Sequence, residues 1–138
     1  MSLSLRTIKL IFATVLAIYL ATALGLSYAT AAGIIAILSV LDTRKSSFKM
    51  ARNRLFSTLL ALIIAVLTFA LFGFGIWTLG IYLALYVPLA YRFNWEAGIA
   101  PSTVLVTHLL LEQDISLIFL GNELALFLIG AGLALLFN

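Results

Sequence analysis

The chain has 138 residues, of which 64% are hydrophobic and 9% are charged, and its formal net charge is +3. A soluble domain of this length could not bury so much apolar surface, because much of a small domain's surface must face water. The composition therefore excludes a soluble globular fold and indicates an integral membrane protein. The chain contains no cysteine, which excludes a cysteine nucleophile and a zinc–thiolate site.

Apolar runs follow one another along the whole chain, separated by short polar stretches. A helix that crosses a bilayer needs about 20 mostly apolar residues. The first and third runs reach this length, and the others approach it when their polar ends are included. We therefore predict a single all-α transmembrane domain, a polytopic helical bundle. Its six predicted spans cover residues 7–26, 29–47, 54–73, 76–92, 97–112 and 116–138.

The charged residues predict the orientation of these spans. If the N-terminus is cytoplasmic, all eight Lys and Arg residues fall in the inside segments 1–9, 42–54 and 92–96. The outside turns contain neither Lys nor Arg, and the acidic residues Glu112, Asp114 and Glu123 lie at that end. This distribution follows the positive-inside rule and predicts that both termini are cytoplasmic. The Lys and Arg residues then serve to orient the spans in the membrane, so the net positive charge does not indicate nucleic acid as a partner.

The second half of the chain is weakly similar in sequence to the first half. "AAGIIAILSVLD" resembles "EAGIAPSTVLVTHLLLE", and each is followed by a polar stretch and then by "NRLFSTLLALIIAV" or "NELALFLIGAGLAL". Because three spans separate the two units, they would cross the membrane in opposite directions. Inverted repeats of this kind are common in secondary transporters, where paired short segments mark the binding region. A 3+3 inverted repeat is therefore our hypothesis for this chain.

The segment "PSTVLVTHLL" holds the polar residues of the fifth predicted span. Pro101 removes one backbone hydrogen bond, and the hydroxyls of Ser102 and Thr103 could satisfy the carbonyls that it frees. Thr103 and Thr107 share one helix face, with His108 beside them. Such a stripe should face protein or water rather than lipid. The alternatives are a packed helix kink and a histidine at the membrane interface.

Arg52 and Arg54, at the start of the third span, are the candidates for pairing with an organic anion. Arginine meets a carboxylate in a two-pronged geometry, and a helix N-terminus adds positive potential. The alternative is that this basic segment only anchors the topology. The sequence has no phosphate-binding loop, no HExxH motif, no hydrolase motif and no cluster of metal ligands. We therefore expect no enzyme activity, no catalytic residues, no metal and no cofactor.

Several blocks of the chain resemble the membrane region of the bacterial aromatic acid exporter family, member 1. The blocks are "GLSYATAAGIIAILSVLDTRKSSFKMARNRLFSTLLALIIAV", "NWEAGIAPSTVLVTHLL" and "GNELALFLIGAGLALLFN". At greater distance the chain is similar to fusaric-acid-resistance-like transporters and to plant aluminium-activated malate transporters. The resemblance implies a six-span helical unit that moves organic anions, forms a dimer and, in many members, continues into a soluble cytoplasmic domain.

The wider superfamily shows an Arg-x-x-Gly-Thr-x-x-Gly pattern after its second span. Here Arg54 and Thr58 match that pattern, while Ser57 and Ala61 replace its two glycines. The resemblance therefore assigns substrate contacts to Arg54 and Thr58. Because neither glycine is present, the sequence leaves open whether the helices make the close backbone contact that the glycines allow.

Together these observations predict a multi-pass transporter of a bacterial inner membrane that exports organic, in particular aromatic, carboxylates. Its predicted partners are the lipid bilayer, the anion substrate and a second copy of the chain. The alternatives are an anion channel and a membrane scaffold that carries a cytoplasmic domain without transporting. The predicted substrate-binding residues are Arg52, Arg54, Thr58, Ser102, Thr103, Thr107 and His108.

Overall fold

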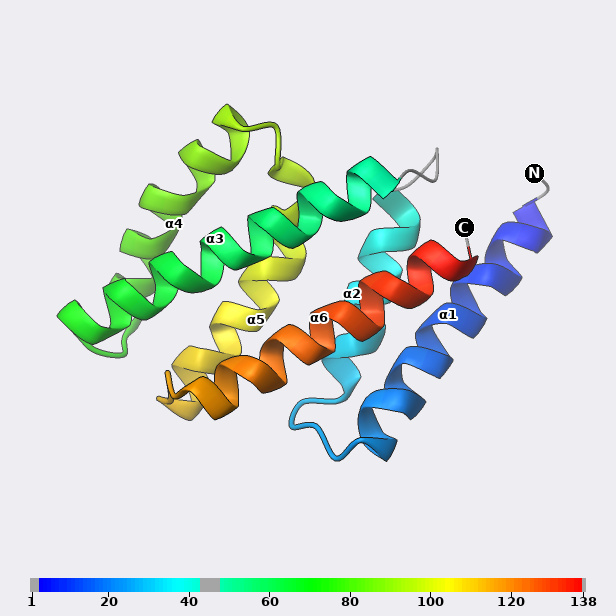
Figure 1. Cartoon of the computed structure of the whole chain (residues 1–138), viewed down its shortest axis with the longest axis horizontal. Helices are drawn as coiled ribbons and strands as arrows, with labels where there is room; N and C mark the ends of the chain where they lie inside the picture. Colours follow the sequence, from blue (N-terminus) through cyan, green and yellow to red (C-terminus); the bar gives the residue numbers. More distant parts are fainter. Residues whose placement is uncertain (1–2, 43–47, 138) are drawn as a thin grey trace. The chain divides into compact units, whose positions relative to one another are not determined.

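A computed structural model describes residues 3–42 and 48–137 of the chain (Figure 1). These residues form α1 (Leu3–Ala23), α2 (Thr30–Asp42), α3 (Phe48–Phe72), α4 (Ile76–Arg92), the 3-10 helix η1 (Glu96–Gly98), α5 (Ile99–Glu112) and α6 (Leu117–Phe137). Within the two described ranges there is no strand, so the predicted all-α class is confirmed. Part of the predicted basic loop, residues 43–47, lies outside the described residues.

Among the residues that the structure describes, three of the six α-helices are long and apolar enough to cross a bilayer. They are α1 over Leu5–Ala23, α3 over Lys49–Phe72 and α6 over Leu117–Phe137. The helices α2, α4 and α5 have 13, 17 and 14 residues. Each is shorter than the roughly 20 residues that span the hydrocarbon core without help from flanking segments. The helices support a membrane protein, and a count of six spans stays a prediction.

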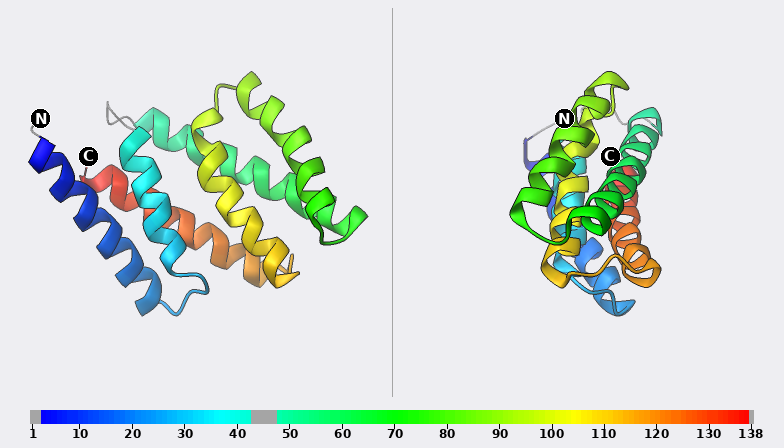
Figure 2. Two further views of the ribbon diagram at one scale, coloured as in Figure 1. Left: turned by 180° about the vertical axis from the view of Figure 1, so that it is seen from behind. Right: turned by 90° about the vertical axis from the view of Figure 1, so that its left-hand side faces the viewer.

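The helices cluster into two compact units, which we describe separately. Unit 1 contains α1, α2, the start of α3 up to Ala51 and α6 from Asn122. Its helices α1 and α2 pack side by side, as the views in Figure 2 show. Ala13, Ala17 and Ala21, which recur every four residues along α1, are all fully buried. Small side chains at this spacing allow close helix packing where lipid provides no hydrophobic drive.

Two further contacts hold unit 1 together. The Asn122 side chain closes the loop between α1 and α2, because its Oδ1 accepts the Ser27 N–H at 2.8 Å and its Nδ2 donates to the Ser27 carbonyl at 3.1 Å. Gly130 places α6 directly against α2. A Cβ atom at Gly130 would lie 2.6 Å from the Ala32 carbonyl oxygen and 2.8 Å from Ile35 Cβ. This seam therefore depends on the absence of a side chain at position 130.

Gly130→Ala is expected to destabilise the protein by about 1–3 kcal/mol, because a methyl group meeting backbone cannot be accommodated without moving a helix. Gly132→Ala is the matched control in the same helix, since no atom lies within 4 Å of a Cβ there. The control should be neutral or slightly stabilising, because alanine is the better helix former. Thermal unfolding of both variants in detergent measures the difference, and equal unfolding temperatures would contradict the tight seam.

Unit 2 comprises residues 52–121, which include most of α3, all of α4, η1 and α5, and the first turn of α6. Here α4 packs against α5 and η1. The buried side of α4 presents Thr78, Tyr82, Tyr86 and Ala90, again at a spacing of four residues. Three of these four buried residues carry a hydroxyl, so α4 presents a row of hydroxyl groups to the interior of unit 2.

The position of Pro101 differs from the expected kink. Helix α5 begins at Ile99, so Pro101 lies in its first turn. Backbone N–H groups in the first turn have no partner within the helix, so proline interrupts no hydrogen bond there. The hydroxyls of Ser102 and Thr103 are therefore not needed to repair a broken helix. They remain available for contacts between helices.

Candidate functional site

Four buried hydroxyl groups from three helices meet inside unit 2. Ser57 Oγ on α3 shares a hydrogen bond of 2.5 Å with Tyr86 Oη on α4. Thr58 Oγ1 on α3 shares one of 3.1 Å with Ser102 Oγ on α5. The Ser102 hydroxyl also lies near that of Tyr86, so the two pairs are neighbours. All four side chains are fully buried. We refer to Ser57, Thr58, Tyr86 and Ser102 as the hydroxyl cluster.

Gly98 allows the cluster to assemble. A Cβ atom at Gly98 would lie 2.5 Å from Ser57 Cβ, 2.6 Å from Ser57 Oγ and 3.4 Å from the Arg54 carbonyl oxygen. The start of α5 therefore touches α3 at a glycine, and this contact brings Ser102 within reach of Thr58. The sequence left a close backbone contact open, because Ser57 replaces a superfamily glycine. In this chain the glycine at the contact is Gly98, at the start of α5, and not a residue of α3.

Tyr82 and Thr103 add two buried hydroxyls whose hydrogen-bonding capacity is unused. The Tyr82 ring stacks on that of Tyr86, with centroids 5.3 Å apart and an interplanar angle of 16°. Its hydroxyl lies near that of Thr103, but neither oxygen makes a hydrogen bond of acceptable geometry within the described part of the chain. Leaving a buried polar group unsatisfied costs about 1–3 kcal/mol. A site that exchanges polar ligands would account for that cost.

The tyrosine pair provides a direct comparison of a satisfied and an unsatisfied hydroxyl. Tyr86→Phe removes the bond to Ser57 and is expected to cost about 0.5–1.5 kcal/mol of stability. Tyr82→Phe removes a hydroxyl without a well-formed bond, so it should leave stability unchanged or raise it. Thermal unfolding in detergent tests both, and an equal loss in the two variants would show that Tyr82 is hydrogen-bonded.

Arg54 is buried beside the hydroxyl cluster. It lies on α3 three and four residues before Ser57 and Thr58, so all three side chains share one face of the helix. Only 3% of Arg54 is exposed. A charged side chain inside an apolar helix is costly and is usually kept for a function. Arg52, by contrast, is exposed, so the structure separates the two predicted arginines.

The remaining predicted residues of α5 have different surroundings. Thr107 Oγ1 donates to the Val104 carbonyl of its own helix at 2.6 Å, which satisfies that hydroxyl internally. His108 is buried, at 7% exposure, and lies further along α5 than the hydroxyl cluster. The structure therefore joins Thr58 and Ser102 directly and places Arg54 and Thr103 beside them. It does not bring Arg52, Thr107 or His108 into the cluster.

Sequence reasoning missed Ser57, Tyr82 and Tyr86. The signal for the tyrosines was present, because Thr78, Tyr82 and Tyr86 recur every four residues on an otherwise apolar helix. Ser57 was considered only as a substituted glycine. Among the described residues no group of three or more His, Asp or Glu side chains could hold a metal ion.

Comparison with known proteins gives a family for the chain. The profile described as "Aromatic acid exporter family member 1" matches residues 1–138. "Uncharacterized protein YqjA" of Bacillus subtilis (strain 168) is 35% identical over 133 residues, which cover 96% of this chain and 41% of that protein. The chain thus spans less than half the length of this curated relative. No solved structure matches.

Proposed function

Because the chain belongs to the aromatic acid exporter family, member 1, we propose that it moves organic, in particular aromatic, carboxylate anions out of the cell across a bacterial inner membrane. The observation that carries this proposal is the buried Arg54 beside four buried hydroxyls. A guanidinium pairs with a carboxylate through two parallel hydrogen bonds. The hydroxyls can donate to the same anion, since each can rotate away from its present partner.

The chemistry of the cluster suits transport better than permanent binding. Neutral hydroxyls bind an anion more weakly than further cations would, because charge-assisted hydrogen bonds are about twice as strong as neutral ones. A single buried arginine therefore attracts the carboxylate, and the hydroxyl cluster replaces part of its hydration shell. Tyr82 and Thr103 extend the row of hydroxyls from Tyr86 and Ser102. Thr107 and His108 are the proposed contacts further along α5.

The proposed topology has six spans, with the basic segments and both termini in the cytoplasm. The composition of the two units supports the inverted repeat. Unit 1 takes α1 and α2 from the first half of the chain and most of α6 from the second, and unit 2 takes α4 and α5 from the second half and most of α3 from the first. Each unit therefore contains the first two helices of one half of the chain and most of the third helix of the other half. A second copy of the chain is the proposed partner.

Transport by the purified protein tests the proposal directly. Vesicles that contain the protein and are loaded with labelled benzoate should release it faster than protein-free vesicles, and the rate should saturate with benzoate concentration. Large unitary currents in planar bilayers would instead favour an anion channel. Release equal to that of protein-free vesicles, with the protein folded and inserted, would contradict transport and favour a scaffold.

A further inference from the structure

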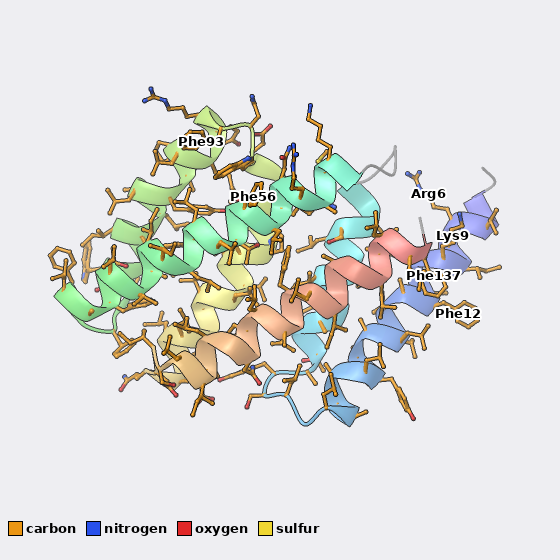
Figure 3. The ribbon with its side chains drawn as sticks, viewed as in Figure 1. Arg6, Lys9, Phe12, Phe56, Phe93 and Phe137 are labelled. Atoms are coloured by element: carbon orange, nitrogen blue, oxygen red, sulfur yellow. The ribbon has the colours of Figure 1, made fainter. Side chains whose placement is uncertain are left out.

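Three aromatic side chains gather at the end of unit 2 where α3 begins and α4 ends. The Trp95 ring lies 5.8 Å from that of Phe56 on α3 and 4.9 Å from that of Phe93, which caps α4. Figure 3 labels Phe56 and Phe93 at this end. Phe56 is 42% and Phe93 50% exposed. We call Phe56, Phe93 and Trp95 the aromatic cluster.

Two exposed arginines lie close along the chain to members of this aromatic cluster. Arg52 lies four residues before Phe56, so the two side chains share one face of α3. Arg92 directly precedes Phe93 and is also exposed. Aromatic faces hold other rings in stacked or edge-to-face contact, and guanidinium groups pair with carboxylates. This end of unit 2 therefore offers both recognition elements of a ring that carries a carboxylate.

The aromatic cluster is connected to the hydroxyl cluster through the backbone. Phe56 is the residue before Ser57. The Trp95 N–H donates to the Ala90 carbonyl at 2.7 Å, and the Trp95 carbonyl accepts the Gly98 N–H at 3.0 Å. Gly98 in turn lies against Ser57. Trp95 is thus held in place by the same turn that positions α5 on α3. Gly98 in this turn lies against Ser57 of the hydroxyl cluster and the Arg54 carbonyl.

We infer that the aromatic cluster, with Arg52 and Arg92, is a binding site for aromatic carboxylates at the entrance to the hydroxyl cluster. The inference deepens the proposed function and rests on it for the direction of transport, but not for binding itself. It assigns selection for the ring to Trp95 and Phe56, and selection for the charge to the two arginines. The competing explanation is an anchor at the membrane interface, where aromatic residues are common.

The chain contains only two tryptophans, which makes binding measurable without a label. Trp77 lies at the opposite end of α4 and is 89% exposed. Trp77→Leu leaves Trp95 as the only indole, and Trp95→Leu leaves Trp77. We expect benzoate to quench the fluorescence of the Trp77→Leu protein along a saturable curve. The Trp95→Leu protein should show only a weak, linear response.

Measurements of transport rate distinguish a site that selects for an aromatic ring from an anchor at the membrane interface. Benzoate and cyclohexanecarboxylate have similar size and equal charge, but only benzoate has an aromatic ring. Trp95→Leu should raise the KM for benzoate about fivefold to tenfold, the effect of losing one ring contact, and leave that for cyclohexanecarboxylate unchanged. Phe56→Leu should give a change in the same direction, and Trp77→Leu should change neither constant.

The outcomes distinguish this inference from the proposed function. Saturable quenching of Trp95 with no flux in vesicles would retain the binding site and contradict transport. Saturable flux without saturable quenching would retain transport and overturn the binding site. Equal changes for both substrates in Trp95→Leu, or equal effects of Trp95→Leu and Trp77→Leu, would also overturn the inference, because an anchor does not distinguish a phenyl from a cyclohexyl ring.

Discussion

Arg54→Gln is expected to reduce benzoate flux by about 100-fold, the largest effect on transport of any single substitution in this chain. Removing one partner of a buried charge pair costs about 2–5 kcal/mol, and 2.7 kcal/mol corresponds to a factor of about 100. Arg54 is buried on the face of α3 that carries Ser57 and Thr58. Glutamine keeps hydrogen-bond donors but loses the charge, so the substitution tests the charge itself.

Two companion variants sharpen this test. Arg54→Lys keeps the charge but not the two-pronged geometry, so we expect an intermediate loss of about tenfold. Arg6→Gln removes an exposed arginine of α1 and should leave flux unchanged. Thermal unfolding of each variant separates a transport defect from a folding defect. Normal flux in a well-folded Arg54→Gln protein would remove Arg54 from the mechanism.

The helical class could be predicted because hydropathy alone specifies it. Long continuous apolar runs separated by turns predict helices, because a helix satisfies its backbone hydrogen bonds within a single segment in lipid. The site was harder, because a contact between helices depends on which faces meet. Thr58 and Ser102 were both predicted, but from separate arguments, and nothing in their spacing along the chain predicts that their hydroxyls share a hydrogen bond. Thr107 was predicted from a shared face with Thr103, yet its hydroxyl bonds to its own helix.

Gly98 is a second example of a contact between helices that the sequence does not predict. In the sequence it is one of nine glycines and belongs to the repeated Ala-Gly-Ile motif. Its equivalent in the first half, Gly33, lies against an apolar neighbour, since a Cβ there would lie 2.6 Å from Ile18 Cγ1. Only the structure shows that Gly98 faces Ser57 and the Arg54 backbone, and hence that it controls the candidate site.

Gly98→Ala should therefore have the largest effect on stability, about 2–4 kcal/mol, because the new methyl group must displace α5 and break cluster hydrogen bonds. Ser57 Cβ and Oγ are the two atoms nearest to that methyl group, so removing both with Ser57→Gly should relieve the clash. Alone, Ser57→Gly costs about 1–2 kcal/mol through a lost hydrogen bond and a helical glycine.

The double variant, Gly98→Ala with Ser57→Gly, should be more stable than Gly98→Ala alone, although each change is destabilising by itself. Such a departure from additivity is the expected signature of two residues in direct contact. Gly80→Ala is the control, because no atom lies within 4 Å of a Cβ there, and it should combine additively with Ser57→Gly. Thermal unfolding of all five variants completes the cycle. If Gly98→Ala and Ser57→Gly are also additive, the two helices do not meet at this glycine, and the hydroxyl cluster cannot be assembled as described.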